Sequence, residues 1–213
     1  QHGQITEVRG QFDQSQAQYG SYQIQANGQF DWQQLPDQWQ LQLRGLEILV
    51  NEKPVGIAGL EVVVDAQQIT TRTAQVKLEQ AVMVMGMINE IPTRINQPIQ
   101  ALAPIGQIEQ VQLLVSRNQS REFLFSAEMQ NVGVTAWKGV PQVAHGQGHI
   151  WLSRRGGKVT LDNTPISLGF SKLRDQPWQF TRLQGQFSWH YLADRYRFRS
   201  SLMEMDTGAG LIH

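Results

Sequence analysis

The chain has 213 residues, which is enough for one large domain or two small ones with a sizeable core. Its 18 Lys and Arg balance its 18 Asp and Glu, and this balance argues against the broad basic surface of a nucleic-acid-binding protein. Charged residues make up only 17% of the chain, so its 31 glutamines, spread between apolar positions, must supply most of the polar surface.

The sequence contains no cysteine, which excludes disulfides, thiolate nucleophiles and cysteine-based zinc sites. The chain opens at Gln1 without an initiator Met or a signal peptide. The longest uninterrupted apolar run, residues 81–88, is too short to span a bilayer. We expect one continuous domain excised from a longer polypeptide.

Residues 1–70 are predicted to be a strand-rich segment. Apolar and polar residues alternate in two of its runs, marked by Tyr22, Ile24 and Ala26 and then by Leu60, Val62 and Val64. A period of two is typical of strands with one apolar face and one wet face. Turn signals at 27–28, and later at 156–157, 163–165 and 175–177, predict short strands joined in an antiparallel meander.

A short motif of Gly, usually Gln, and then Ile or Phe recurs at irregular spacing. Its copies begin at Gly3, Gly10, Gly28, Gly106 and Gly185, with a variant at Gly148. We interpret each copy as a strand start, in which Gly takes the special backbone angles of a turn or bulge and the large residue anchors one face. Chance recurrence in a Gln-rich chain is the alternative.

Residues 71–103 are predicted to be a short helical insertion. The stretch 79–91 is rich in Met, Val and Ala and is apolar around most of a helix, until Pro92 stops it. Residues 93–102 predict a second short helix, weakened by Pro98. We expect these helices to cap an end of the sheet or to cover one face, and a buried strand over 82–85 is the alternative.

Residues 104–213 are predicted to be a second strand-rich segment, with alternation over 123–130 and 187–191. Between them lies NVGVTAWKGVPQVAHGQGHIWL, residues 131–152. We expect Val132 and Val134 to end one strand and residues 137–141 to form a corner, because Pro141 lacks an N–H. Gly146 and Gly148 would then allow the turn into a strand at 150–152.

Candidate metal ligands are sparse. His145 and His149 have the spacing that places two ligands on one helical face, but glycines lie between them and a strand pattern follows. Residues four apart in a strand are roughly 13 Å from each other, too far for one metal ion, so we expect no metal site. His2, His190 and His213 are scattered along the chain.

Catalytic motifs are also missing from the sequence. Glu204 and Asp206 are similar to the Glu-x-Asp core of retaining glycosidases, but Gly208 stands where those sites need a further acid. There is no Gly-x-Ser-x-Gly elbow and no phosphate-cradling loop. Residues 154–158 predict a basic hairpin tip, for which contact with lipid headgroups and the absence of any special role are both open. We expect no enzyme and no cofactor.

The second half of the chain carries motifs of a known family. It has a Pro-Ile-Gly turn at 104–106, a Trp-x-Gly-x-Pro segment at 137–141, Gly-Gln-Gly-His-Ile at 146–150 and Leu-Gln-Gly-Gln-Phe-Ser-Trp at 183–189. In this order, after a short helical stretch, the motifs resemble the YhdP branch of the AsmA-like proteins of Gram-negative bacteria. The resemblance is specific over 104–192, extends back to residue 70, and is only generic over 1–69.

The resemblance implies the periplasmic part of a longer protein anchored in the inner membrane. In such proteins repeated strands form a groove with an apolar interior, thought to conduct phospholipid toward the outer membrane and so to support its barrier. None of the matching motifs is catalytic. The implied partners are phospholipid or another acyl-chain lipid and the rest of the protein's own chain. Open sheet edges also make self-association of the fragment a risk.

The expected fold is therefore mainly β: an antiparallel meander curled into an open apolar groove, with one or two short helices around 79–102. Acyl chains would lie against its apolar side, where each methylene removed from water contributes about 0.8 kcal/mol. The residues predicted to face the lipid are Phe123, Phe125, Ala127, Met129, Ile150, Leu152, Phe187, Trp189 and Tyr191. A register error of one residue would move a strand's whole set to the other face.

Two other hypotheses stay open at the level of sequence. A closed β-sandwich would bury the apolar faces, and exposed rings of Trp32, Trp39 and Trp178 would then serve a carbohydrate-binding or assembly module. A hydrolase using Glu204 and Asp206 is the third possibility.

Overall fold

The computed structural model describes residues 6–57, 59–87, 93–117, 122–138, 140–170, 173–192, 195–201, 203–207 and 211–212. Its helices are α1 (Leu78–Met87) and α2 (Thr93–Leu102). Its strands are β1 (Glu7–Tyr19), β2 (Tyr22–Gln34), β3 (Gln38–Val50), β4 (Lys53–Val55), β5 (Leu60–Asp65), β6 (Gln68–Lys77), β7 (Ile105–Ser116), β8 (Phe123–Val134), β9 (Gln142–Ser153), β10 (Gly156–Gly169), β11 (Trp178–Leu192), β12 (Arg195–Ser200), β13 (Glu204–Asp206) and β14 (Leu211–Ile212).

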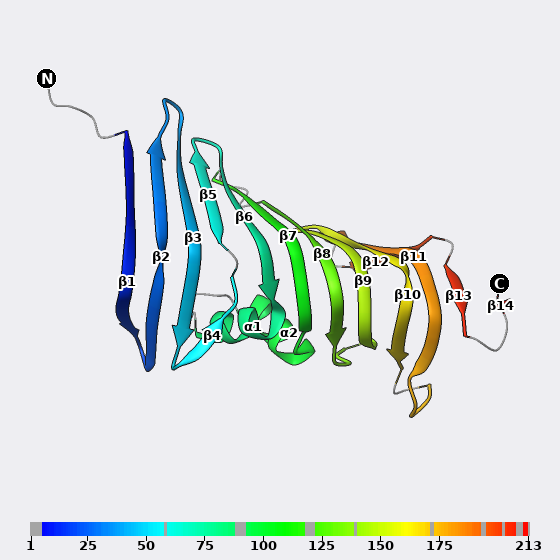
Figure 1. The fold of residues 1–213 in the computed structure, drawn as a ribbon. Helices are drawn as coiled ribbons and strands as arrows, with labels where there is room; N and C mark the ends of the chain where they lie inside the picture. The colour runs from blue at the N-terminus through cyan, green and yellow to red at the C-terminus, as the bar shows by residue number, and fades with distance from the viewer. Residues whose placement is uncertain are drawn as a thin grey trace, which may run out of the picture. The chain divides into compact units, whose positions relative to one another are not determined.

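The strands form one open sheet (Figure 1). They pair in the order β1-β2-β3-β5-β6-β7-β8-β9-β10-β11-β13-β14, with β4 beside β3 and β12 beside β11. The prediction of a mainly β antiparallel meander with one or two short helices is confirmed, and two helices are present. Every strand that the structure describes belongs to this sheet, and its first and last strands do not pair with each other. The closed sandwich is therefore wrong.

Backbone contacts group the chain into two compact units. Unit 1 comprises residues 1–76 and 110–125, and unit 2 comprises residues 77–109 and 126–213. Strands β1 to β5 lie in unit 1, and both helices and strands β9 to β14 lie in unit 2.

The helical insertion is present, but it is shorter than the predicted range 71–103, because residues 71–77 continue β6. Predicted residues 88–92 lie outside the described part. Hydrogen bonds connect the helices to the start of β7 and to the residue that follows β8. The Gly106 N–H donates to Glu79 Oε1 at 3.1 Å, and Thr135 Oγ1 donates to the Ala101 carbonyl at 2.8 Å. Neither described helix has the length and apolar character needed to cross a membrane.

Strands longer than expected overturn two of the predicted turns. Residues 27–28 lie inside β2 and residues 163–165 inside β10, whereas 175–177 form a loop before β11. The hairpin near 156–157 is confirmed, with Arg154 and Arg155 as its turn residues. The two misplaced signals mark irregular strand pairing: the Asn27 Oδ1 accepts a 2.7 Å hydrogen bond from the backbone N–H of Gln14, where β1 shifts its register.

The glycine motif does not mark strand starts. Its copies at Gly10, Gly28, Gly148 and Gly185 lie inside β1, β2, β9 and β11; only Gly106 lies near a strand start, and Gly3 is outside the described residues. In β1 and β2 the two Gly-Gln-Phe copies pair with each other in antiparallel register, so that Gly10 faces Phe30 and Phe12 faces Gly28. These two copies are therefore glycines inside strands, each covered by an aromatic ring from the neighbouring strand.

Candidate functional site

Unit 1 has one apolar sheet face. Two register shifts keep it continuous, one in β1 between Phe12 and Ser15 and one in β3. Along β2 the face consists of the even-numbered residues 22–34. In β3, Leu41 and Leu43 are odd-numbered and face Trp32 and Phe30. After a bulge between positions 44 and 47, the even-numbered Ile48 takes over opposite Ala26. The extra residue restores the phase that strict alternation would lose.

An open pocket of about 870 Å³ lies in unit 1 beside the β3 bulge. Leu43, Leu46 and Leu60 contribute apolar wall, and the charged side chains of Glu61 and Arg72 also line the pocket. Its volume falls within the usual range for small-molecule sites. The pocket combines apolar wall with a polar margin.

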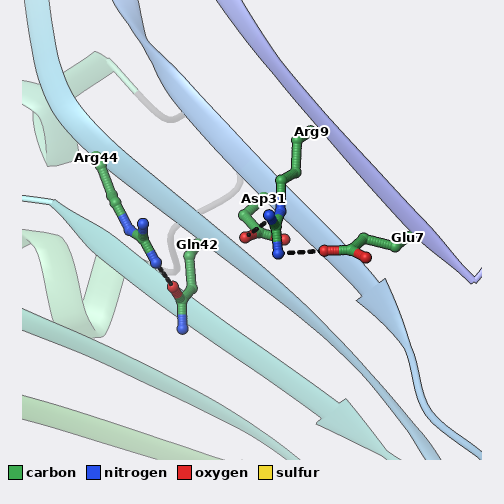
Figure 2. A network of polar contacts seen from close by, with 5 residues as sticks. All are labelled: Glu7, Arg9, Asp31, Gln42 and Arg44. Carbon is green, nitrogen blue, oxygen red and sulfur yellow. Dashed lines mark hydrogen bonds and ion pairs between the residues drawn. The ribbon is translucent and has the colours of Figure 1, made fainter.

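The opposite face of unit 1 is polar and carries a charged row, of which Figure 2 shows Arg9, Asp31 and Gln42. Directly opposed positions on β1, β2, β3, β5 and β6 are, in turn, Arg9, Asp31, Gln42, Glu61 and Arg72. Arg9 Nε lies 3.1 Å from Asp31 Oδ2, and Arg72 Nη1 lies 3.1 Å from Glu61 Oε2. Gln42 separates the two acids, so like charges are not direct neighbours. Glutamine thus keeps this face polar without adding charge.

Unit 2 has a corresponding apolar face across β9 to β12. Register produces two cross-strand rows, Ile150–Val159–Phe187 and Leu152–Gly157–Trp189–Phe198. The Phe187 ring stacks on Phe198 with centroids 5.7 Å apart and tilts against Trp189 at 6.0 Å. Phe187 is 40% exposed and Phe198 61% exposed, so this end of the face is open to solvent.

A buried cluster continues the same face toward the other end of β10 and β11. Ile166, Phe180 and Leu183 form its centre, and Leu183 is only 1% exposed. Phe180 is even-numbered and Leu183 odd-numbered, yet both face this side because the pairing shifts between them. A second shift follows position 161 in β10. Residues at the two shifts are hydrogen-bonded to each other: Arg182 Nε donates to Asn163 Oδ1 at 2.9 Å.

The four predicted lipid-facing residues of β8 alternate along that strand. Ala127 and Met129 are buried, at 4% and 7% exposure. Glu128 lies 3.4 Å from the His149 imidazole, so these two side chains share the polar face, and Ala127 and Met129 share the apolar face with Ile150. Phe123 and Phe125 belong to the same alternating set of β8 as Ala127 and Met129, and both are half-buried.

Of the remaining predicted residues, the structure brings Ile150, Leu152, Phe187 and Trp189 together on the β9–β11 face. Tyr191 continues this alternation at 42% exposure. Lipid contact of the nine residues remains a prediction. The buried cluster around Leu183 was not predicted, because the apolar residues 166, 168, 180 and 183 fall on one face only when the bulges are known.

The YhdP family model matches residues 1–208. The chain belongs to the YhdP family. The match includes residues 1–69, where the motifs alone gave only a generic likeness. No curated protein and no solved structure gives a significant match.

The predicted corner follows Val134, the last residue of β8, and the described residues of the Trp-x-Gly-x-Pro segment of this YhdP-family chain lie in it; Gly139 is outside the described residues. The backbone N–H of Trp137 donates to the Val140 carbonyl at 3.1 Å, and the reverse hydrogen bond is 2.9 Å long. The predicted turn at Gly146 and Gly148 is wrong, since both lie inside β9. Gly148 has φ +136°, and a Cβ there would lie 1.9 Å from the Thr160 carbonyl oxygen. Close approach of two strands, rather than a turn, requires this glycine.

The two central histidines have different partners in the YhdP-family sheet. His145 Nδ1 lies 2.7 Å from Asn131 Oδ1, and both residues have positive φ, at 64° and 53°. The His149 ring stacks on Trp151 with centroids 5.5 Å apart. Among the described residues, no three side chains of metal-ligating type form a group that could hold an ion.

The three tryptophans of the sandwich hypothesis are dispersed, whereas Glu204 and Asp206 of the hydrolase hypothesis lie together on β13. On β13, Glu204 lies opposite Gln184 of β11 and Asp206 lies opposite Arg182 of β11. Gly208 is outside the described residues. Trp32 and Trp39 belong to the apolar face of unit 1, opposite Leu41 and Val64. Trp178, at 40% exposure, packs on Phe170 and Phe180 in unit 2.

Proposed function

We propose that the chain is a non-enzymatic, lipid-binding segment of a YhdP-type protein, located in the periplasm and connected to an inner-membrane anchor elsewhere in its polypeptide. Its apolar sheet faces would hold acyl chains of phospholipid moving between the inner and outer membranes. The observation that carries the proposal is the apolar face of β9 to β12, which stays continuous through two register shifts and ends in exposed aromatic rings.

The energetic basis is burial of hydrocarbon. Each methylene that leaves water for this face contributes about 0.8 kcal/mol, so partial burial of two acyl chains offsets a large part of the cost of leaving a bilayer. Exposed apolar surface of this kind normally marks a binding site. The polar side of the same strands keeps the sheet wetted, so lipid is held on one side only.

The test is native mass spectrometry of the purified chain, followed by solvent extraction and lipid analysis. Phe187→Asp places a charge on the apolar face, and Ser188→Asp places the same charge one residue away on the polar face. Because a charge against hydrocarbon costs at least about 2 kcal/mol, we expect lipid occupancy to fall more than tenfold in Phe187→Asp. Ser188→Asp lies beside Lys158 and Arg199 and should leave occupancy unchanged.

Equal lipid occupancy in the two variants would refute the assignment of this face. Absence of extractable phospholipid from the unmodified chain would refute lipid holding by this segment. Far-UV circular dichroism of both variants checks that the sheet remains folded.

A further inference from the structure

Strand β12 presents a row of arginines on one face. Arg195, Arg197 and Arg199 alternate along the strand and are exposed. Arg197 faces His190 on β11, and Arg199 faces Ser188. Alternate residues of a strand lie about 6.6 Å apart, so the three guanidinium groups mark a line of about 13 Å.

Basic charge continues on the same face across β11 and β10. Lys158 lies opposite Ser188 on one side and opposite Trp151 on the other, with Nζ 4.1 Å from the Trp151 ring centroid. The exposed turn of this hairpin consists of Arg154 and Arg155. The hairpin and β12 together contain six of the 18 Lys and Arg of a chain whose net charge is zero, so the basic charge is concentrated locally.

The acids of this face lie away from the arginine row. Glu128 lies beside His149, Asp162 lies at the register shift of β10, and Glu204 and Asp206 face Gln184 and Arg182 in the first half of β11. Trp151 is 38% exposed within the basic region. An exposed Trp beside Lys and Arg is typical of surfaces that meet the headgroup layer of a membrane.

We infer that Lys158, Arg195, Arg197 and Arg199, together with Trp151, form a basic face that docks on the surface of an anionic phospholipid bilayer. Three of the cations lie along β12, which pairs with β11, and Lys158 lies on β10. This arrangement of positive charge over neighbouring strands matches a plane of headgroup phosphates. This face is the reverse of the one that carries Phe187 and Trp189, so the inference does not depend on lipid being held there.

The experiment is flotation of the 213-residue chain with vesicles of phosphatidylcholine, with and without phosphatidylglycerol. The variant replaces Arg195, Arg197 and Arg199 with Gln. Each cation near an anionic surface strengthens binding about fivefold, so we expect the triple variant to bind phosphatidylglycerol vesicles roughly 100-fold more weakly. Added salt should weaken binding of the unmodified chain, since the interaction is screened.

The matched control removes the same charge elsewhere, by Gln at the exposed positions Arg44, Lys53 and Arg174. Vesicle binding of this control should stay within about threefold of the unmodified chain, because none of the three positions lies on β10, β11 or β12. An equal loss in both triple variants, or equal binding to vesicles of phosphatidylcholine alone, overturns the inference. Displacement by inorganic phosphate but not by chloride at the same ionic strength also overturns it, because it indicates a discrete anion site.

Two further measurements distinguish loss of bilayer docking from misfolding of the variant and from loss of lipid holding. If the Gln variant loses its β-sheet circular dichroism, the variant with Lys at the three positions decides: it should bind as the unmodified chain does, and loss of binding in a folded Lys variant contradicts a surface-charge mechanism. Phe187→Asp should retain vesicle binding even where it loses extractable lipid, so that docking and lipid holding fail independently.

Discussion

The ring of Phe30 on β2 lies over Gly10 on β1, where a Cβ on the glycine would be only 2.6 Å from Cε1 of the ring. The reciprocal pair has the same geometry, with a Cβ on Gly28 2.9 Å from Cζ of Phe12. Glycine is a poor strand residue by itself, because it has no side chain to pack and loses much backbone freedom. Here the missing side chain is the space that the ring occupies.

Gly10→Ala should therefore destabilise unit 1. The added methyl group displaces the Phe30 ring, and overpacking of this kind costs about 1–3 kcal/mol. The control is Gln11→Ala, one residue along on the polar face, for which we expect a change within about 0.5 kcal/mol. Urea unfolding followed by tryptophan fluorescence measures both, and equal midpoints would show that the ring does not need the space.

Gly148→Ala should be the more damaging substitution. Its methyl group would meet the Thr160 carbonyl oxygen of the neighbouring strand at 1.9 Å, and the residue has φ +136°. A backbone atom cannot rotate away as a side chain can, so we expect a loss of about 3 kcal/mol or more.

Thermal unfolding compares this variant with Gly86→Ala in α1, where the new methyl group would lie 3.3 Å from the end of the Gln100 side chain. Alanine is the better helix residue by about 0.5–1 kcal/mol, so the helical variant should be as stable as the unmodified chain or more so. A smaller loss for Gly148→Ala than for Gly10→Ala would contradict the proposed strand approach.

Leu183→Ala tests the buried cluster of unit 2. Leu183 is 1% exposed and faces Met205 of β13. Its truncation leaves a cavity that should lower the free energy of unfolding by about 2–5 kcal/mol. Leu192→Ala, at the 53% exposed end of the same strand, is the matched control and should change stability by less than about 0.5 kcal/mol. Chemical denaturation gives both values, and similar losses would mean that the cluster does not form a core.

Asn131 tests the positive-φ backbone of β8, which neighbours β9 in the sheet. Its φ of 53° favours Asn or Gly, and its Oδ1 lies 2.7 Å from the His145 ring. Asn131→Gly removes only the side-chain hydrogen bond, whereas Asn131→Ala also strains the backbone. We expect the alanine variant to be less stable than the glycine variant by about 1 kcal/mol. Hydrogen exchange of the β8 and β9 amides should show the difference locally; equal protection would rule out strain at this position.

Some features follow directly from residue order. Alternation at Leu60, Val62 and Val64 predicted one apolar face, and register places these residues opposite Leu43, Leu41 and Trp39. The helical stretch before Pro92 was also evident, because its apolar residues do not alternate. The parity of Phe180 against Leu183 could not be predicted, since a bulge has no sequence signal as strong as two-residue periodicity.

Composition and residue order predicted a neutral, Gln-rich, antiparallel β protein with one or two short helices and with motifs that resemble the YhdP family. These properties depend on composition and on near neighbours along the chain. Which residues share a face became clear from the three-dimensional fold, because it depends on pairing between strands and on the extra residues inserted at bulges. The fold also showed that Gly10, Gly28 and Gly148 lie inside strands, where the neighbouring strand leaves no room for a side chain.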